Sequence, residues 1–203
     1  MRVPLKLKFY YLLSRLIQKN KTPNFSMDSP REIRDGEEFA LEKLKTYLSE
    51  NNINADDLSI KQFPSGYSNL TYFLKSSSEE FVLRRPPFGA KSLQGGHDMF
   101  REYNVLKNLK SQFLKVPEVY LYCDNSEIIG APFYLMERVK GYIIRPNLQQ
   151  KDSPGKEVIQ NVSKSLVSTL VELHNVDIDQ ANLNELGNIC LLYTSDAADE
   201  ERG

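Results

Sequence analysis

The sequence predicts an α+β fold in which an antiparallel sheet packs with helices. Residues 70–74 alternate as in a strand with one buried face, and strand-like segments at 59–63 and 81–85 lie on either side, with turn-forming segments between them. Apolar residues recur at helical spacing over 37–48 and 98–110. With 203 residues, 40% of them hydrophobic and 26% charged, the chain suits one globular domain or two small lobes.

Composition excludes several classes of protein. A net charge of −1 gives no support to a nucleic-acid partner. No run of about 18 apolar residues offers a membrane span. The only cysteines are Cys123 and Cys190, so a disulfide framework is excluded and a reducing, cytoplasmic location is expected.

The first half of the chain reads as one helix followed by three strands. Asp35 and Glu38 have capping-box spacing at the start of the helix over 37–48. A strand over 59–63 leads into a turn at 64–66. The polar residues 76–80 then close a hairpin between the strands 70–74 and 81–85.

Pro86, Pro87 and Gly89 end the third strand, and Gly95-Gly96 predict a loop before the next helix. Two further strands are expected at 118–122 and 132–139, with a turn over 124–126 between them.

A polar linker is expected after Gly141, and Ser153 and Pro154 suit the cap and first turn of a last helix. That helix has a predicted core face made of Val158, Ile159, Val162, Leu166, Leu170 and Leu173.

The two ends of the chain differ from its middle. Residues 1–26 hold six basic residues, no acidic one, and apolar residues at helical spacing. They are either an amphipathic extension that makes weak membrane contact or the result of a start taken too early, with Met27 as the native start. Residues 190–200 match the translation of a transposase sequencing adapter, so 190–203 are expected to be an artefact and the native sequence to be interrupted near Ile189.

The turn after the first strand has the composition of a phosphate-binding loop. Gly66 allows a ligand to approach the backbone, and Ser65, Ser68 and Asn69, with Tyr67 between them, present hydroxyl and amide groups. An ordinary hairpin turn is the alternative interpretation.

Val82 and Arg84 point to the same face of their strand because they are two residues apart. Val82 could cover a nucleotide base while Arg84 holds its phosphates bidentately. A solvated Arg84-Arg85 pair on an edge strand is the alternative. Glu102, on the next helix, has a spacing that lets it face the sheet and pair with Arg84, which a purely structural ion pair would also explain.

Five segments together carry a resemblance to a known family. The chain resembles the phosphate-binding lobe of protein kinases and, more closely, the aminoglycoside phosphotransferase and choline-kinase-like family. Within that family it is most similar to the kinase-like domain fused ahead of some acyl-CoA dehydrogenases. The segments are SGYSNLTY at 65–72, FVLRRPP at 81–87, HDMFREY at 97–103, IGAPFYLMERVKG at 129–141 and LHNVD at 173–177.

The resemblance implies a kinase-like N-terminal lobe over 27–140 that binds a nucleotide. It also implies a linker and only the start of the helical C-terminal lobe over 141–189. ATP and Mg²⁺ are the implied cofactors.

By the same resemblance Glu137 to Val139 form the hinge that meets the adenine, with Met136 behind the base. Arg84, where many kinases have lysine, would hold the α- and β-phosphates, and Glu102 would orient it.

The catalytic residues are expected beyond Ile189, because no H-G-D-x-x-x-x-N loop is present. His174, Asp177 and Asn182 approach that pattern, but the histidine is one residue too far away, so we interpret them as a packed helix end followed by a cap. His97 is predicted to cap its helix rather than bind a metal, since no second ligand lies at a useful spacing.

The expected function is that of an ATP-dependent phosphotransferase whose acceptor is an unknown hydroxyl-bearing small molecule. This part of it would lack the catalytic loop. The alternative is a non-catalytic kinase-like binding or regulatory module, which the arginine at position 84 favours.

Overall fold

The computed structural model describes residues 29–64, 69–87, 97–141 and 155–186. Its helices are α2 (Leu41–Glu50), α3 (Met99–Leu109), α4 (Ser126–Ile129) and α5 (Lys156–His174), followed by a 3₁₀ turn at Asn184–Leu186. Its strands are β1 (Ser59–Gln62), β2 (Leu70–Lys75), β3 (Glu80–Arg85), β4 (Val119–Cys123) and β5 (Phe133–Glu137).

The five strands form one sheet in the order β1-β2-β3-β5-β4, and every neighbouring pair is antiparallel. The predicted α+β class and the predicted strands are therefore confirmed. β3 lies at the centre of this sheet, which places its side chains between those of β2 and β5.

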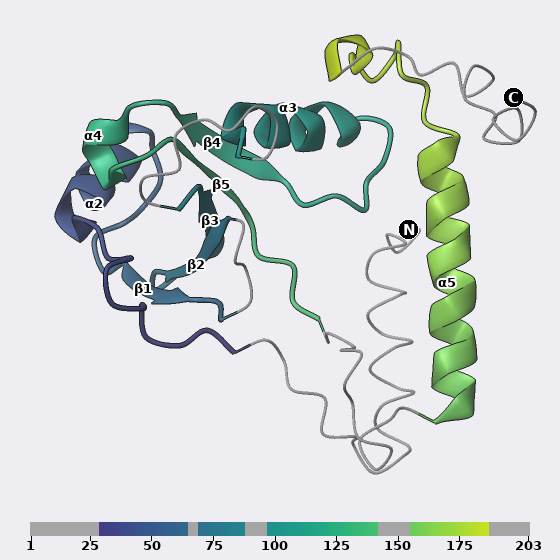
Figure 1. The fold of residues 1–203 in the computed structure, drawn as a ribbon, viewed down its shortest axis with the longest axis horizontal. Coiled ribbons are helices and arrows are strands. Elements are labelled where there is room, and N and C mark those ends of the chain that lie inside the picture. The colour runs from purple at the N-terminus through teal and green to yellow at the C-terminus, as the bar shows by residue number, and fades with distance from the viewer. Residues whose placement is uncertain (1–28, 65–68, 88–96, 142–154, 187–203) are drawn as a thin grey trace, which may run out of the picture.

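One face of the sheet packs against α2 and forms the main hydrophobic core (Figure 1). Because side chains alternate along a strand, every second residue of β2, β3 and β5 enters this core. The ring of Tyr47 on α2 meets Phe133 on β5 edge to face at 5.9 Å. The core includes the fully buried side chains of Leu44, Leu48, Tyr72, Leu74, Leu83, Phe133 and Leu135.

The opposite face of the sheet is covered over β4 and β5 by α3 (Figure 1). Tyr103 on α3 lies against Tyr122 on β4 and Tyr134 on β5, with ring centroids 5.7 and 6.5 Å apart. Asp98 begins the helix by accepting a hydrogen bond from the backbone N–H of Arg101. This packing fixes α3 relative to the two strands that it covers.

The segment before α2 is bound to the sheet. Arg31 forms a two-way backbone bridge with Gln62 at the edge strand β1. The hydroxyl of Tyr72 donates to the carbonyl of Glu37, and burial raises the pKa of that tyrosine to about 12. The hydroxyl therefore stays a donor, and the segment before α2 is tied to the sheet.

One helix boundary differs from the prediction, and one short helix was not predicted. α2 begins four residues later than expected, because Glu38 accepts from the backbone N–H of Gly36 in a turn where Gly36 has φ of 80°, and Ala40 is the N-cap. The turn expected at 124–126 leads directly into α4, which Asn125 caps. α5 begins at Lys156.

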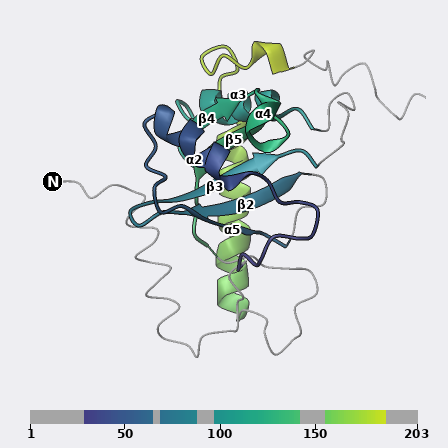
Figure 2. The same cartoon turned by 90° about the vertical axis from the view of Figure 1, so that its left-hand side faces the viewer.

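Most of the predicted core face of α5 is exposed in the structure, and only Val158 and Leu173 of that face are half-buried. Figure 1 shows this helix standing apart from the sheet, and in Figure 2, turned by 90°, it runs behind the sheet. Near its end Lys115, from the α3–β4 connection, pairs with Glu172 at 2.6 Å. The exposed apolar residues of α5 are Ile159, Val162, Leu166, Val167, Leu170 and Val171.

Within the described ranges no helix is both long and apolar enough to cross a lipid bilayer. Several predictions fall outside these ranges: the amphipathic extension at 1–26, the turn residues 65–68, the loop around 95–96, the cap at 153–154 and the adapter-derived tail at 190–203.

The exposed face of α5 predicts that the chain self-associates. Replacing Leu166 and Leu170 with lysine should raise the monomer fraction in sedimentation velocity, because both side chains are exposed. The thermal transition should change little. A wild-type chain that is already monomeric and unfolds cooperatively would contradict this prediction.

A second prediction concerns the contribution of Leu83, on the central strand β3, to stability. Leu83→Ala should lower the free energy of unfolding by about 3 kcal/mol, because the side chain is fully buried and leaves a cavity. Leu114→Ala is the control, since Leu114 is 68% exposed and its loss should change stability by less than about 0.5 kcal/mol. Urea unfolding followed by circular dichroism measures both variants, and equal losses would contradict the assigned core.

Candidate functional site

The sheet face that is not covered by α2 carries the residues expected at the site. Strand register places them in two rows that cross β2, β3 and β5. One row is apolar and the other is polar, so a ligand on this face would meet both kinds of surface. The rows are Phe73, Val82 and Met136, and Thr71, Arg84 and Tyr134.

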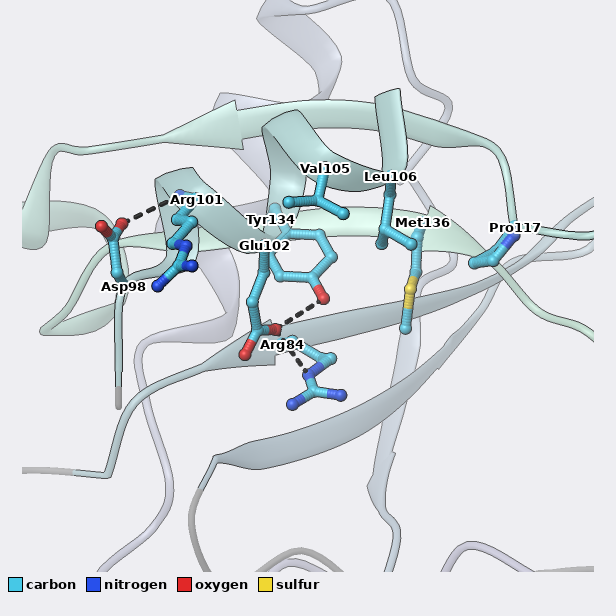
Figure 3. Close-up of a pocket in the computed structure, with 9 residues that line it drawn as sticks. All are labelled: Arg84, Asp98, Arg101, Glu102, Val105, Leu106, Pro117, Tyr134 and Met136. Atoms are coloured by element: carbon cyan, nitrogen blue, oxygen red, sulfur yellow. Dashed lines mark hydrogen bonds and ion pairs between the residues drawn. The ribbon is translucent and has the colours of Figure 1, made fainter. Parts of the chain in front are cut away.

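Arg84 lies beside Glu102, as the sequence predicted. The Nε atom of Arg84 is 3.4 Å from Oε2 of Glu102, and each side chain is about one-third exposed. Nε itself is buried and makes no hydrogen bond, so the contact is an ion pair. Figure 3 shows both terminal nitrogens of Arg84 on the side away from the carboxylate.

The alternative of a solvated arginine pair on an edge strand is wrong, because β3 is central. Arg85 points to the opposite face and is fully buried. It donates from Nε to the carbonyl of Pro86 and from Nη1 to the carbonyl of Ile129. Burial lowers its pKa, although the ring of Tyr72 nearby acts in the other direction. Arg85 is therefore structural.

Two neutral donors hold the carboxylate of Glu102. Asn69 donates from Nδ2 to Oε1 at 2.8 Å, and the hydroxyl of Tyr134 donates to Oε2 at 2.9 Å (Figure 3 shows the second bond). Tyr134 is 1% exposed, and this burial raises the pKa of its hydroxyl, an effect that Arg84 opposes and Glu102 reinforces. The phenol therefore remains protonated and acts as a donor.

The side chain of Asn69 has partners that the sequence did not predict. Its Oδ1 atom is 2.8 Å from Nδ1 of His97, so both ends of the amide are bound to residues at the start of α3 or just before it. The predicted role of Asn69 as a phosphate ligand does not match this geometry. His97 is likewise not a helix cap, since Asp98 is the N-cap.

The sequence carried no signal for the contact between Asn69 and His97, because the two are far apart in the chain. Tyr134 could have been found: it is two residues before Met136, so strand alternation places both on one face.

A cavity of about 460 Å³ opens between α3 and this face of the sheet (Figure 3). Its polar side includes Arg84 and Glu102, and its apolar side lies under the middle of α3. The lining residues are Arg84, Asp98, Arg101, Glu102, Val105, Leu106, Pro117, Tyr134 and Met136.

The predicted hinge begins at the last residue of β5. Glu137 exchanges hydrogen bonds with Glu118, donating from its backbone N–H at 2.7 Å and accepting at its side chain at 3.1 Å. The strand predicted to reach Val139 ends at Glu137, and Val139 is exposed. Val82 is buried and Met136 half-buried on the sheet face described above.

Charged residues lie beside Phe73, at the β2 end of the apolar row. Glu80 pairs with Arg138 at 3.3 Å and with Lys140 at 2.7 Å. The Arg138 guanidinium also lies 4.1 Å from the ring centroid of Phe73, a cation–π contact. The hydrogen bond from Lys140 and the charge of Arg138 hold the pKa of Glu80 below its usual value.

The near-match to a catalytic loop is a structural turn. Asp177 accepts from the backbone N–H groups of Asp179 and Gln180, which confirms its predicted capping role. His174 is exposed, so its predicted packing is wrong. Among the residues that the structure describes, no group of three His, Cys, Asp or Glu side chains could hold a metal ion.

Comparison with known proteins identifies the family. Residues 59–197 match the model of the phosphotransferase enzyme family, a stretch that begins at β1 and includes the Arg84–Glu102 pair. The chain belongs to this family.

The curated relatives are much longer than this chain. Acyl-CoA dehydrogenase family member 11 of Rattus norvegicus is 37% identical over 161 residues, which cover 77% of this chain and 20% of the relative. Family member 10 of Mus musculus is 35% identical over 150 residues, 73% of this chain and 14% of the relative. The predicted resemblance to a kinase-like domain joined to acyl-CoA dehydrogenases is confirmed.

The fold also matches a solved structure. A Ralstonia eutropha protein assigned as an aminoglycoside phosphotransferase superposes with a TM-score of 0.59 at 26% identity. The match covers 74% of this chain and 43% of the other. The predicted kinase-like fold is thus confirmed.

The lowered pKa of Glu80 predicts a pH dependence. A carboxylate with a depressed folded-state pKa stabilises the fold above its unfolded value near 4.5 and loses this effect as the pH falls. Glu80→Gln should therefore cost roughly 0.5–1 kcal/mol at pH 7 and almost nothing at pH 3.

Urea unfolding at the two pH values measures the difference. Glu79→Gln is the matched control, because this neighbouring carboxylate is exposed and forms no ion pair among the described residues. A cost for Glu80→Gln that is the same at both pH values would show that the ion pairs do not stabilise the fold.

Proposed function

We propose that this chain is the nucleotide-binding part of an ATP-dependent phosphotransferase that phosphorylates a hydroxyl group of a small molecule in the cytoplasm. One observation carries the proposal: Arg84 is held through Nε by Glu102 while its two terminal nitrogens face away from that carboxylate. The family match and the kinase-like fold support the same class of reaction.

The geometry suits the triphosphate end of a nucleotide. A guanidinium offers donors in a rigid fork, so Arg84 can use Nε for Glu102 and both Nη atoms for phosphate oxygens. A lysine would divide a single ammonium between the two tasks. We expect Ser65, Gly66, Tyr67 and Ser68 to add hydroxyl and backbone donors to the phosphates.

The apolar row suits the base. Val82 is buried next to Met136 in the strand register, two residues from Arg84 on the same face. A base lying on these side chains would place its sugar and phosphates towards Arg84. Glu137 and Val139 would then meet the edge of the base through their backbone groups.

The transfer step itself needs groups that the described residues do not offer. In-line transfer requires a carboxylate that orients the attacking hydroxyl and oxygen ligands for Mg²⁺. Asp177 is engaged as a cap, and the described ranges hold no metal-binding cluster. We therefore assign nucleotide binding to this chain and expect the acceptor and metal sites to lie elsewhere in the protein.

The non-catalytic alternative has no observation of its own in its favour. It was based on arginine in place of lysine, and the paired geometry of Arg84 offers a positive role for the arginine.

Substitution of Arg84 tests the proposal. Arg84→Ala should weaken ATP binding at least tenfold, because it removes the cation that faces the phosphates. Arg84→Lys should retain part of the affinity. Lys61→Ala is the control: Lys61 is also a strand cation paired with a glutamate, Glu32, at 3.7 Å, but lies on the edge strand β1.

Isothermal titration of the 203-residue chain with ATP and, separately, with adenosine measures these effects. Adenosine binding should not depend on Arg84, because adenosine has no phosphate group for the guanidinium to bind. Equal ATP affinity in wild type and Arg84→Ala would contradict the proposed function.

A further inference from the structure

We propose that Tyr134 and Asn69 are positioning residues that fix the carboxylate of Glu102, so that Arg84 presents its terminal nitrogens to the phosphates. This inference rests on the proposed function and assigns a role to two residues that do not themselves contact the ligand. It starts from the unequal distances around Glu102.

Three polar groups lie close to the carboxylate of Glu102, and the two neutral hydrogen-bond donors are closer to it than the arginine. Asn69 and Tyr134 lie 2.8 and 2.9 Å from Oε1 and Oε2, whereas Nε of Arg84 is 3.4 Å from Oε2. A carboxylate left to arginine alone would prefer the bidentate arrangement, in which two guanidinium nitrogens face its two oxygens. Here Asn69 occupies one oxygen and Tyr134 shares the other.

The consequence is a geometric constraint on Arg84. Asn69 on Oε1 and Tyr134 on Oε2 fix the orientation of the carboxylate, and in this orientation the guanidinium meets Glu102 only through Nε. The two terminal nitrogens lie on the side away from Glu102, and no described residue forms a hydrogen bond with them (Figure 3). They can therefore bind another ligand. The two neutral donors thereby keep Glu102 from capturing both Nη atoms.

Both positioning residues are themselves firmly held. Tyr134 is 1% exposed on β5, between β3 and β4, and its ring packs against Tyr103 of α3. Asn69, just before β2, is 6% exposed, and His97 binds the carbonyl end of its amide. Two buried donors, one on β5 and one just before β2, therefore converge on one carboxylate of α3 and hold it in place.

Tyr134→Phe tests this role, because it removes only the hydroxyl. Tyr122→Phe is the matched control: Tyr122 lies directly opposite Tyr134 on β4, packs against Tyr103 too, and no described residue forms a hydrogen bond with its hydroxyl. We expect Tyr134→Phe to weaken ATP binding about fivefold, in line with the loss of one hydrogen bond to a charged group. Tyr122→Phe should have no effect.

A double-mutant cycle distinguishes positioning from general stability. If Tyr134 acts through Glu102, its hydroxyl should have an effect below about twofold once Glu102 is replaced by alanine, because interacting residues are not additive. Equal losses in both backgrounds would overturn the proposal. Loss of ATP affinity in Arg84→Ala together with no loss in Tyr134→Phe would overturn the positioning role while leaving the proposed function intact.

A second measurement needs no nucleotide. The Arg84 Nε–H is buried beside Glu102, so its NMR signal should exchange slowly with water in the wild type. Tyr134→Phe and Asn69→Leu should change that signal and speed its exchange, whereas Tyr122→Phe should not. An Arg84 signal that is the same in all four proteins would overturn the inference whether or not the chain binds ATP.

Discussion

The ion pair between Arg84 and Glu102 is the contact on which the rest of the site depends. Each charge is two-thirds removed from water, and a charge in that position is costly unless it is paired and hydrogen-bonded. Glu102 meets this requirement with Asn69 and Tyr134, while Arg84 meets it only in part. The arrangement leaves cationic donors at a cavity, which suits an anionic ligand.

The central position of β3 explains how one strand serves both the site and the core. Neighbouring arginines point to opposite faces, so Arg84 reaches the cavity while Arg85 ties the strand end to Ile129 in the α4 region. Leu83, on the same face as Arg85, enters the core and anchors the strand. The positions of these residues along β3 therefore place Arg84 in the wall of the cavity, and α3 places Glu102 beside it.

The sequence predicted the parts of this structure that depend on local periodicity. The strand over 70–74 followed from alternation, and the other strands followed from strand-like segments bounded by turn residues. The pairing of Arg84 with Glu102 followed from placing one on a strand and the other on the next helix. Contacts decided by tertiary packing were not predictable: the amide of Asn69 turns towards α3, and His97 binds it instead of capping a helix. The late start of α2 had a local cause, since Glu38 is engaged by the turn at Gly36.

The most direct test of the account is a crystal structure of the protein with a non-hydrolysable ATP analogue. We expect both terminal nitrogens of Arg84 to lie within about 3 Å of phosphate oxygens while Nε stays beside Glu102. A nucleotide whose phosphates lie away from Arg84, or a guanidinium that turns both Nη atoms to Glu102 when the nucleotide is bound, would contradict it.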